Sequence, residues 1–486
     1  MPQNCFIGID QGSSSTKALA ISKEGQVLFQ TRRDLPLPFR AGDRVEYDPS
    51  GILQSVNDAL TEVVQTVRAS GFTPEAIGLS CQRSSCLAWN DGTGETLSPV
   101  ISWRDMRGSA FVQQVSKDRD RIFELTGLPI TPYYSASKFR WLRENMPALG
   151  KDTTVFGTLS SFLAQRLVKK ERAVIDHTQA ARTQLMNIRK LDWDPDLLAD
   201  FGLTGTRLPD IVPVIHDFGE VILPAGAVPL RACLGDQQAA MVGLGVLEQG
   251  DGGINYGTGG FLMVNTGTTL VAAKGLMASV HYSTEDERYY LLEGSVNAAG
   301  EALDWVRSNL HLFNDYAEVD DLCWQAASDV VAFIGLNGTG SPHWENKISS
   351  SIHGMTPTST SADIIRATVE GIAFFMKEIA EEIAAAGLKA RDISVSGGLA
   401  PLTYLVQFQS DILQKDLRVS GQEEVSALGA ALLAGLAQGA WSPADIKNMV
   451  SSGETVNPRL NPGASRRYRR WKELHRVTGV LDRVES

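Results

Sequence analysis

The sequence predicts an α/β fold that is divided into two domains. Predicted strands and helices alternate along the chain, which is typical of this class. The chain has 486 residues, more than one hydrophobic core comfortably supports. Two glycine-rich turns, each between two apolar strands, occupy residues 6–17 and 254–264, about half the chain apart. They indicate two related halves that grip one ligand from opposite sides, and we place the domains at residues 1–243 and 244–486.

Strands and one clear helix are expected in the first half. Residues 52–69 carry apolar side chains at helical spacing and end before Gly71, which predicts a helix. The many prolines between residues 185 and 232 predict loops and short elements. The other elements expected here are strands at residues 5–10, 17–22, 26–31, 76–80 and 85–90, and a mainly helical segment at residues 109–170.

The second half repeats this alternation. A long helix is expected from Ser361, which would cap it, to about Gly387, because apolar residues line one face. The tail from residue 464 is rich in arginine, which predicts a solvated terminal helix. The other elements expected are strands at residues 254–273 and 393–395, a hairpin near residues 289–293, and helices at residues 300–312 and 425–439.

The composition indicates a globular protein that binds neither nucleic acid nor a membrane. Apolar residues make up 43% of the chain and charged residues 21%. The formal net charge of -11 argues against a nucleic-acid groove or an anionic membrane as the main partner. The sequence has no recognisable signal peptide and no apolar run long enough for a membrane span. The five cysteines form no CxxC pair, so we expect a reduced, cytoplasmic protein.

The first glycine-rich turn has the composition of a phosphate loop. Asp10 closes its first strand, and Gly12 opens the loop. Four hydroxyl residues follow in succession: Ser13, Ser14, Ser15 and Thr16. Small residues of this kind let backbone N–H groups and hydroxyls reach a phosphate. The alternative is a plain hairpin followed by surface serines.

Two charged residues beside this loop have complementary roles if it binds a phosphate. A carboxylate next to a phosphate is unfavourable unless Mg²⁺ lies between them, so Asp10 is a candidate for holding the metal, directly or through water. Lys17 can offset the charge of the phosphate itself. The pair therefore predicts a nucleotide that binds together with Mg²⁺.

Two more glycine-rich turns in the second half strengthen this hypothesis. Residues 257–260 repeat the setting of strand, turn and strand, and Thr258 and Gly259 lie at its centre. A predicted strand at residues 394–396 ends in Gly397 and Gly398, where a flat ring such as adenine can lie against bare backbone. Taken singly, the paired glycines also fit a turn that enters a helix. All three turns together favour ATP as the ligand.

A carboxylate near the expected domain junction is the candidate general base. Asp236 follows Gly235 at the start of an apolar helix, where it can accept a proton from an attacking hydroxyl. Gln237 beside it can hydrogen-bond the same substrate. The alternative is that Asp236 is an ordinary helix cap.

Polar and aromatic residues in the first half are suited to a small polyol. Hydrogen-bonding groups bind the hydroxyls of such a ligand, and an aromatic wall covers its C–H face. Taken singly, each of these residues also fits a structural ion pair or a core aromatic. The three clusters are Gln82-Arg83-Ser84-Ser85, Trp103-Arg104-Asp105-Met106-Arg107 and Pro132-Tyr133-Tyr134-Ser135.

Taken together, these motifs resemble the FGGY family of carbohydrate kinases, which belongs to the actin-like ATPase superfamily. The resemblance covers nearly the whole chain, from Ile7 to about Trp441, and is strongest to the glycerol kinase branch. It implies two actin-like (ribonuclease H-like) domains with a cleft between them. The stretches that carry it are residues 8–15, 132–135, 191–194, 235–240, 256–259, 408–413 and 427–431.

The resemblance implies a role for individual residues. Asp236 would be the general base, and Asp10 would organise Mg²⁺. The contacts to ATP would come from Ser13, Ser14, Ser15, Lys17, Thr258, Gly259, Gly300, Asp304, Gly398 and Leu402. The pocket for the polyol or sugar would be lined by Arg83, Ser84, Trp103, Asp105, Tyr133, Asp236, Gln237 and Phe261.

Departures from the glycerol kinase pattern leave the acceptor open. Glycerol kinases have a glutamate where this chain has Ser84, an asparagine in place of Leu402 and a glutamine in place of Asp304. Residues 103–107 fit the Trp-x-Asp-x-Arg pattern of sugar kinases. The expected activity is therefore phosphorylation of a small polyol or sugar. The alternatives are a ketose kinase of the xylulose or ribulose type and an actin-like ATPase switch. The sequence does not fix the oligomeric state, and a homodimer is one of the alternatives.

Overall fold

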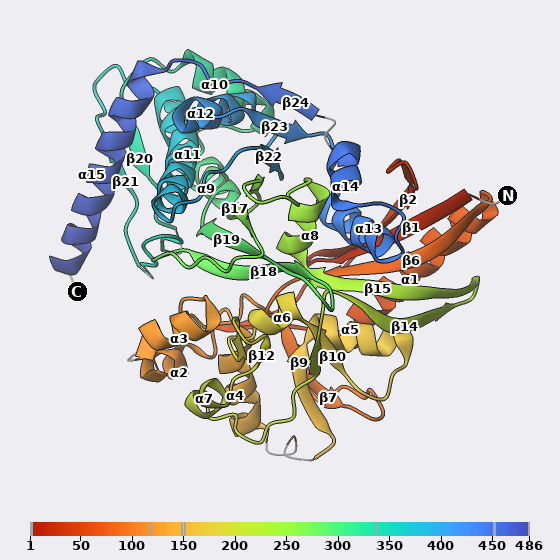
Figure 1. Ribbon diagram of the computed structural model, residues 1–486. Helices are drawn as coiled ribbons and strands as arrows, with labels where there is room; N and C mark the ends of the chain where they lie inside the picture. The colour runs from red at the N-terminus through yellow and green to blue at the C-terminus, as the bar shows by residue number, and fades with distance from the viewer. Residues whose placement is uncertain are drawn as a thin grey trace.

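The computed structural model describes residues 3–115, 118–146, 149, 152–336, 338–345, 347–450 and 453–484. Two large β-sheets form the centres of two bodies, with helices packed around them (Figure 1). The N-terminus lies beside the first sheet. The chain ends on the far side of the second body, along helix α15 (Pro462–Val484).

The first sheet combines an antiparallel meander with parallel strands. β1, β2 and β3 are antiparallel neighbours, whereas β1, β6 and β15 run parallel to one another. Helix α1 (Pro49–Ala69) packs against β2, β3 and β6. The strands lie in the order β14 (Ile215–Leu223), β15 (Gly226–Gly235), β6 (Phe72–Cys81), β1 (Gln3–Gln11), β2 (Ser15–Ser22) and β3 (Val27–Asp34).

The second sheet repeats the same plan. β16, β17 and β19 form an antiparallel meander, and β16, β22 and β23 run parallel. This repeat confirms the expected α/β class built from two related halves. The strands lie in the order β18 (Met277–Ser283), β19 (Arg288–Val296), β17 (Gly260–Gly267), β16 (Gly252–Tyr256), β22 (Ile393–Ser396), β23 (Leu417–Ser420) and β24 (Gly453–Val456).

An additional layer of the first half lies below its main sheet (Figure 1). It contains a five-stranded sheet in the order β4 (Phe39–Ala41), β5 (Arg44–Tyr47), β8 (Val100–Ile101), β7 (Cys86–Asn90) and β9 (Thr154–Thr158). Its helices are α2 (Ser109–Val115), α3 (Arg119–Thr126), α4 (Ser135–Asn145), α5 (Leu159–Val168), α6 (His177–Ala181) and α7 (Pro195–Asp200). Two short pairs join β10 (Val174–Asp176) to β13 (Asp210–Val212) and β11 (Met186–Asn187) to β12 (Asp192–Trp193).

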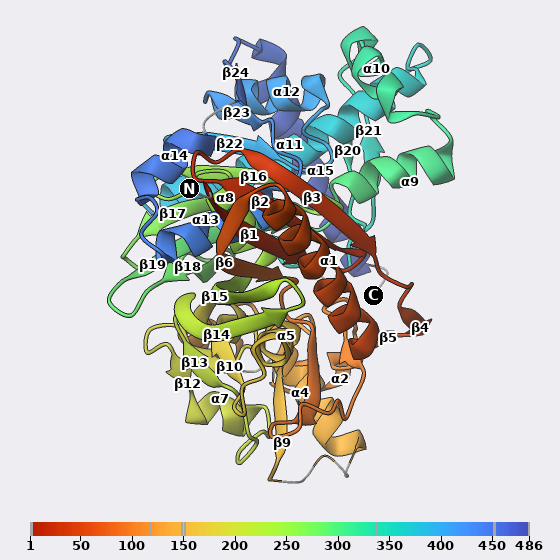
Figure 2. The same cartoon turned by 90° about the vertical axis from the view of Figure 1, so that its right-hand side faces the viewer.

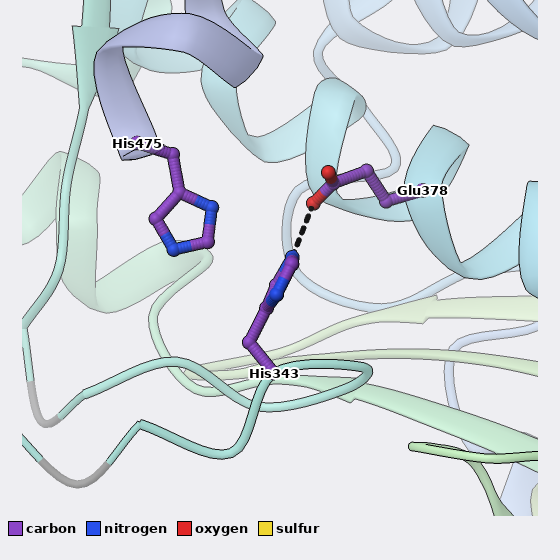
Figure 3. Close-up of side chains that lie close together, drawn as sticks. All are labelled: His343, Glu378 and His475. Carbon is purple, nitrogen blue, oxygen red and sulfur yellow. Dashed lines mark hydrogen bonds and ion pairs between the residues drawn. The ribbon is translucent and has the colours of Figure 1, made fainter. Parts of the chain in front are cut away.

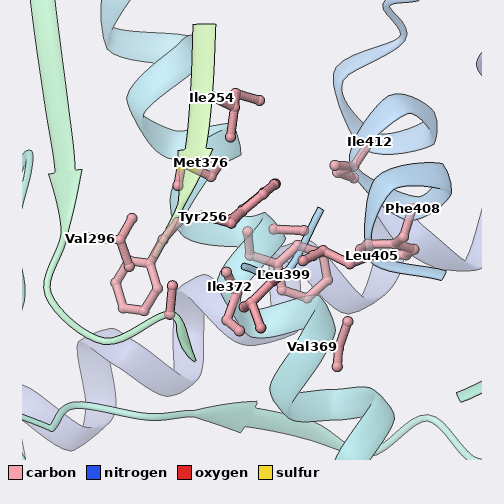
Figure 4. Close-up of a cluster of buried hydrophobic side chains, with 14 of the residues drawn as sticks. Ile254, Tyr256, Val296, Val369, Ile372, Met376, Leu399, Leu405, Phe408 and Ile412 are labelled. Carbon is pink, nitrogen blue, oxygen red and sulfur yellow. The ribbon is translucent and has the colours of Figure 1, made fainter. Parts of the chain in front are cut away.

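The second body has its own hydrophobic core. Side chains of β16 and two helices meet there, among them Tyr256, Ile372 and Phe408 (Figure 4). The phenol of Tyr256 donates to Oε1 of Gln409 at 2.6 Å, so the strand end that precedes Gly257 is firmly held. The elements of this body are α9 (Gly300–Leu310), α10 (Val319–Gln325), α11 (Ser361–Ala385), α12 (Thr403–Leu413), β20 (Val331–Phe333) and β21 (Ser351–His353). Helix α14 (Pro443–Val450) instead packs beside the first sheet (Figure 2), where Ile446 and Val450 share a buried cluster with Phe6 and Ile21.

Two helices join the bodies through very close backbone contacts. Helix α13 (Val425–Ala437) packs on β1 and β6 of the first sheet and on helix α8 (Asp236–Gly243). A Cβ atom at Gly429 would stand 1.8 Å from the carbonyl oxygen of Ala239, and one at Gly8 would stand 1.8 Å from that of Ala427. Glycine is therefore required where these elements cross.

Three of the expected elements differ from the structure. Residues 215–235 form the long strands β14 and β15, although Pro229 and its neighbours predict loops. The long helix α11 is capped by Thr360, one residue before Ser361, in a capping box with Asp363. The C-terminal helix is not solvated all round, because Trp471 is fully buried.

None of the described helices combines the length and the apolar character that a membrane span requires. The five cysteines are free and buried.

Candidate active site

The ends of three parallel strands bring the candidate catalytic residues together. Asp10 lies near the end of β1 and pairs in register with Ser80 of β6. Arg83 follows the end of β6, and Asp236 follows the end of β15, which is also parallel to β6. Ligands of α/β sheets bind outside such carboxyl ends. The sheet topology therefore places residues from positions 10, 83 and 236 at one edge.

Two carboxylates at this edge repel each other. The hydroxyl of Ser80 donates to Oδ1 of Asp10 at 2.8 Å. Removal from water and the negative charge of Asp236 raise the pKa of Asp10 to about 7. Removal from water also raises the pKa of Asp236, although Arg83 opposes this shift. A cation or a proton that binds to these carboxylates would therefore relieve their repulsion.

The first glycine-rich turn is compact, and its serines differ in accessibility. The amide of Gly12 donates to the carbonyl oxygen of Ser15 at 3.0 Å. Ser14 is exposed and Ser13 is half-buried, whereas Ser15 is buried at the start of β2. Two of the three serines therefore offer hydroxyls at the surface of the turn.

Lys17, which the sequence assigns to a phosphate, has a protein partner. Its Nζ lies 2.6 Å from Oε2 of Glu424, directly before α13. In this arrangement its positive charge is already matched by a carboxylate of the second half. The pair links β2 to the helix that crosses between the bodies.

The second turn rests on the start of α9. The amide of Gly300 donates to the carbonyl oxygen of Gly257 at 3.0 Å, and the amide of Glu301 donates to that of Thr258 at 3.1 Å. A Cβ atom at Gly300 would stand 2.8 Å from the carbonyl oxygen of Gly257. The structure therefore brings Thr258, Gly259 and Gly300 together, with Thr258 exposed.

The paired glycines after β22 lie against this turn. Gly397 has a φ of +98°, and a Cβ atom there would stand 2.3 Å from the carbonyl oxygen of Tyr256. At Gly398 a Cβ atom would meet no atom within 4 Å. Both glycines are exposed. Bare backbone is thus open to a flat ligand next to Gly257.

Asp304 and Leu402, the two residues expected near the nucleotide that differ from those of glycerol kinases, have different surroundings. Asp304 is exposed on α9 and accepts hydrogen bonds from the phenol of Tyr316 at 3.1 Å and from Arg307 at 2.8 Å. Leu402 precedes α12 and is buried in the core of the second body. Only the first of these side chains is exposed to solvent.

A buried lysine holds the two aromatic residues of the expected acceptor pocket. The ring centroids of Trp103 and Tyr133 are 6.2 Å apart. Nζ of Lys138 donates to the carbonyl oxygen of Tyr133 at 2.6 Å and to that of Trp103 at 3.2 Å. Burial lowers the pKa of Lys138 to about 8. The sequence alone gives Lys138 no role in the site, because a lysine in the first turn of a helix is typical of the surface.

A buried ion cluster connects the edge of the first sheet to the second body. Arg83 donates to both oxygens of Glu293, at 3.0 and 3.2 Å, and Arg182 also binds Glu293. Glu293 lies on β19 and is fully buried. The guanidinium carbon of Arg83 is 5.8 Å from the ring centre of Phe261. In the sequence, Glu293 directly follows the run Tyr289–Leu292 of a predicted strand, and a charge in such a position has to be paired when it is buried.

Ser84 and Asp105 are largely or fully buried. Ser84 has a φ of +65°, and its hydroxyl donates to the carbonyl oxygen of Arg182 at 3.3 Å. Asp105 is fully buried and accepts hydrogen bonds from the amide of Val45 at 2.7 Å and from Nε of Arg107 at 2.8 Å. Asp105 therefore shapes the loop that carries Trp103.

Gln237 makes a direct link between the halves. Its Oε1 accepts a hydrogen bond from Nδ2 of Asn255 on β16 at 3.2 Å. Asp236 keeps 28% of its side chain exposed, and its Oδ1 lies 3.5 Å from Nε of Arg83. The candidate base is therefore accessible while a cation lies beside it.

Comparisons with known proteins agree with this arrangement. The N-terminal domain of the FGGY family of carbohydrate kinases matches residues 5–243, and the C-terminal domain of that family matches residues 252–438. The chain belongs to the FGGY family of carbohydrate kinases. It is accordingly an enzyme that transfers a phosphoryl group to a carbohydrate or polyol.

Relatives of this FGGY kinase match it over nearly its whole length. It is 31% identical to glycerol kinase from Limosilactobacillus reuteri (strain DSM 20016), covering 97% of each chain. It is 31% identical to glycerol kinase from Enterococcus casseliflavus, covering 98% of this chain and 97% of the relative.

Solved structures confirm the fold of this FGGY kinase. Plasmodium falciparum glycerol kinase with ADP superposes with a TM-score of 0.91 at 28% identity and 98% coverage of both chains. Xylulose kinase from Rhodospirillum rubrum gives a TM-score of 0.89 at 21% identity, covering 98% of this chain and 99% of the other. The actin-like fold class expected from the resemblance is therefore confirmed. The boundary between the domains and the roles of the site residues stay predictions.

Proposed function

We propose that this FGGY kinase transfers the γ-phosphoryl group of ATP to a hydroxyl of a small polyol or sugar, with Asp236 as the general base. The observation that carries the proposal is the position of Asp236 at the carboxyl ends of β1, β6 and β15, where Asp10 and Arg83 also lie. Phosphoryl transfer depends mainly on positioning and on neutralising charge. A partly exposed carboxylate with a raised pKa beside two glycine-rich turns meets both needs.

The triphosphate would lie between the two glycine-rich turns. Ser13 and Ser14 would donate from the first turn, and Thr258 and Gly259 from the second. The nucleotide would lie along Gly300 and Gly398, with the adenosine near Gly398, where the backbone is open. A related glycerol kinase is known with ADP, which supports a nucleotide at the same place here.

The residues present fit a magnesium ion at Asp10. The pKa of Asp10 is raised to about 7, partly by the charge of Asp236, so a divalent cation would relieve the repulsion between the two carboxylates. Carboxylates and phosphates are the ligands that Mg²⁺ prefers, and the bound ion neutralises charge on the transferred group. Asp10 would hold the ion directly or through water.

The acceptor would lie against Trp103 and Tyr133, with its reacting hydroxyl at Asp236. Lys138 fixes the backbone of both aromatic residues, and the ion pair with Glu293 fixes Arg83. Gln237 and Phe261 would complete the pocket. The chain's own residues thus orient the alcohol, and Asp236 accepts its proton at a carboxylate oxygen as the phosphoryl group transfers.

The residue at position 84 favours an acceptor other than glycerol as a second candidate. Ser84 supplies no carboxylate, and its hydroxyl is bonded to the backbone of Arg182. A longer polyol or a ketose of the xylulose or ribulose type would need no acid there. Glu293, a carboxylate of the buried ion cluster, is already paired with Arg83 and Arg182.

The cysteines bear on the compartment in which the kinase works. All five thiols are free and buried, and burial raises the pKa of Cys86 to about 12, which keeps that thiol unreactive. Free thiols fit a reducing compartment. We therefore propose the cytoplasm as the site of the reaction.

A screen for ADP release with different acceptors tests the proposed function. The enzyme would be given ATP and Mg²⁺ with glycerol, erythritol, pentitols, pentuloses or hexuloses. Release of ADP with at least one acceptor, together with a phosphorylated product in mass spectrometry, is the expected result. ADP release at the same rate with and without every acceptor would contradict the proposal and favour an ATPase switch.

A further inference from the structure

Three potential metal ligands from separate segments meet beside the C-terminal helix. His343 lies in the loop between β20 and β21, Glu378 lies on α11 and His475 lies on α15 (Figure 3). One nitrogen or oxygen atom from each residue lies within 4.8 Å of the corresponding atoms of the other two. His343 and Glu378 are 35 positions apart in the sequence and Glu378 and His475 are 97 apart, yet the three side chains converge on one point.

The spacing of the imidazole and the carboxylate suits a shared cation. Nε2 of His343 is 3.1 Å from Oε2 of Glu378. Zinc binds histidine nitrogen and carboxylate oxygen at about 2.0–2.1 Å, so two ligands in a tetrahedral site stand roughly 3.3 Å apart. Small shifts of these side chains would therefore complete such a site.

His475 has the partner that histidine ligands of metals usually have. Its Nε2 lies 2.7 Å from Oε2 of Glu345. A histidine ligand almost always donates its other N–H group to a carboxylate or carbonyl, which fixes the tautomer and the ring orientation. When Nε2 carries the proton that Glu345 accepts, Nδ1 of His475 keeps a lone pair for a cation.

The charge and the burial of the cluster also favour a cation. Glu378, Glu345 and Glu382 all act on His343 with negative charge. The side chain of His475 is 8% exposed and that of Glu378 is 11% exposed, whereas that of His343 is 34% exposed. The cluster is thus shielded on two sides, and an ion can enter past His343.

We propose that His343, Glu378 and His475 bind a divalent transition-metal ion of the zinc class. Two imidazoles and one carboxylate form a common donor set for zinc, with water or a further carboxylate as the fourth ligand. Magnesium and calcium prefer oxygen ligands alone, so this site differs in chemistry from the one expected at Asp10.

The ion would tie the C-terminal helix to the body of the second half. The loop that carries His343 is joined to β19 through the amide of Ser341, which donates to the carbonyl oxygen of Ser295 at 2.8 Å. The indole of Trp344 donates to the carbonyl oxygen of Gly275 at 2.8 Å. One bound ion would therefore link α15, α11 and this loop, and the folded state would gain stability because the unfolded chain lacks the site.

A zinc titration of the full-length protein tests the proposal. The protein is freed of metal with a chelator and titrated with Zn²⁺ in competition with a chromophoric chelator, and its melting temperature is measured in parallel. We expect one tight equivalent and a higher melting temperature. Co²⁺ in place of zinc is expected to give the strong visible absorption of a tetrahedral N,O site, which tests the ligands without any mutation.

Variants separate this site from other places where zinc could bind. His475→Gln and Glu378→Gln are expected to abolish the tight equivalent, and Glu345→Gln to weaken it about 10- to 100-fold. His216→Gln is the matched control, because His216 also faces a glutamate, Glu285, at 3.3 Å, but the described residues supply no third ligand there. Asp10→Asn is also expected to retain the equivalent.

The proposal is overturned if the wild-type protein binds no zinc below millimolar concentration. It is equally overturned if His475→Gln, folded as judged by circular dichroism, binds zinc as tightly as the wild type. Octahedral Co²⁺ absorption would contradict the assigned ligands.

Discussion

Arg83 and Glu293 form a bidentate salt bridge between the two halves of the kinase. The guanidinium donates to the two carboxylate oxygens at 3.0 and 3.2 Å, and Glu293 is fully buried. The arginines hold the pKa of Glu293 well below its usual range, in spite of burial. The same guanidinium lies 3.5 Å from Asp236. This salt bridge therefore connects the two sheets, and it also fixes the positive charge beside the candidate base.

Neutralising this carboxylate should damage stability and catalysis together. Glu293→Gln removes the buried negative charge that Arg83 and Arg182 share and leaves only Asp236 beside Arg83, so we expect a loss of about 3 kcal/mol in the free energy of unfolding. Arg83 would then act more strongly on Asp236 and lower its pKa, and we expect kcat to fall by about tenfold. Urea denaturation and steady-state kinetics measure the two effects. Glu144→Gln, which removes the partner of the surface residue Arg140, is the control, and equal effects in both variants would refute the role of Glu293.

The buried ammonium of Lys138 should be needed to position the acceptor. Lys138→Met leaves the carbonyl oxygens of Trp103 and Tyr133 without a donor, so the aromatic wall should shift. We expect KM for the acceptor to rise about tenfold or more, with a smaller change in KM for ATP. Lys170→Met is the matched control, because Lys170 also binds a backbone carbonyl, at 3.1 Å, but on the surface. An unchanged KM for the acceptor would exclude this role.

Binding of magnesium should weaken in acid. A metal needs the ionised form of Asp10, and the pKa of this group is about 7 in the protein without ligands. Between pH 7 and pH 6 we therefore expect the apparent affinity for Mg²⁺ to fall about fivefold. Calorimetric titrations at several pH values measure it, and a flat profile would contradict the assignment of Asp10.

The same carboxyl makes a prediction about stability. Its pKa is raised from 3.8 to about 7 on folding, so the unfolded chain loses this proton first. The free energy of unfolding should therefore fall as the pH rises through this interval. Asp10→Asn should remove that part of the fall and make the ligand-free protein more stable at pH 8, at the expense of activity. Urea denaturation at pH 5 and pH 8 tests this, and a less stable variant at pH 8 would oppose it.

Position 84 should control the choice of acceptor. Ser84→Glu adds a carboxylate beside the acceptor pocket, so we expect turnover of glycerol to rise and turnover of a longer acceptor to fall. Ser84→Ala, which removes the hydroxyl that binds the carbonyl of Arg182, serves as the control. Product formation with glycerol and with the best acceptor of the screen is compared for the three proteins. The absence of any gain with glycerol would favour the ketose hypothesis.

The parts of the fold set by local pattern were predictable from the sequence. The strands and glycine-rich turns near Asp10 and Gly257, and the helices at residues 52–69 and 425–439, follow from apolar spacing and from the residues that end them. The hairpin of β14 and β15 was missed because Pro229 is typical of loops, yet pairing with β6 holds β15 in the sheet. Packing between distant segments overrode the local preference.

Contacts between distant segments were the hardest to predict in the site. Asp10, Arg83 and Asp236 could be selected because each stands beside a turn or a strand end. Lys138 and Glu293 could not be assigned a role, because it depends on partners far along the chain. The ion pair between Lys17 and Glu424 was unpredictable for the same reason, since it joins β2 to the residue directly before α13.

The role of Asp236 is tested most directly by replacing its carboxylate with an amide of the same shape. Asp236→Asn is predicted to lower kcat for phosphorylation about 100- to 10,000-fold, while ADP binding, measured by calorimetry, stays close to that of the wild type. Asp48→Asn, at the cap of α1, is the matched control for loss of a carboxylate at a helix start. Turnover of Asp236→Asn within a few-fold of the wild type would contradict the account.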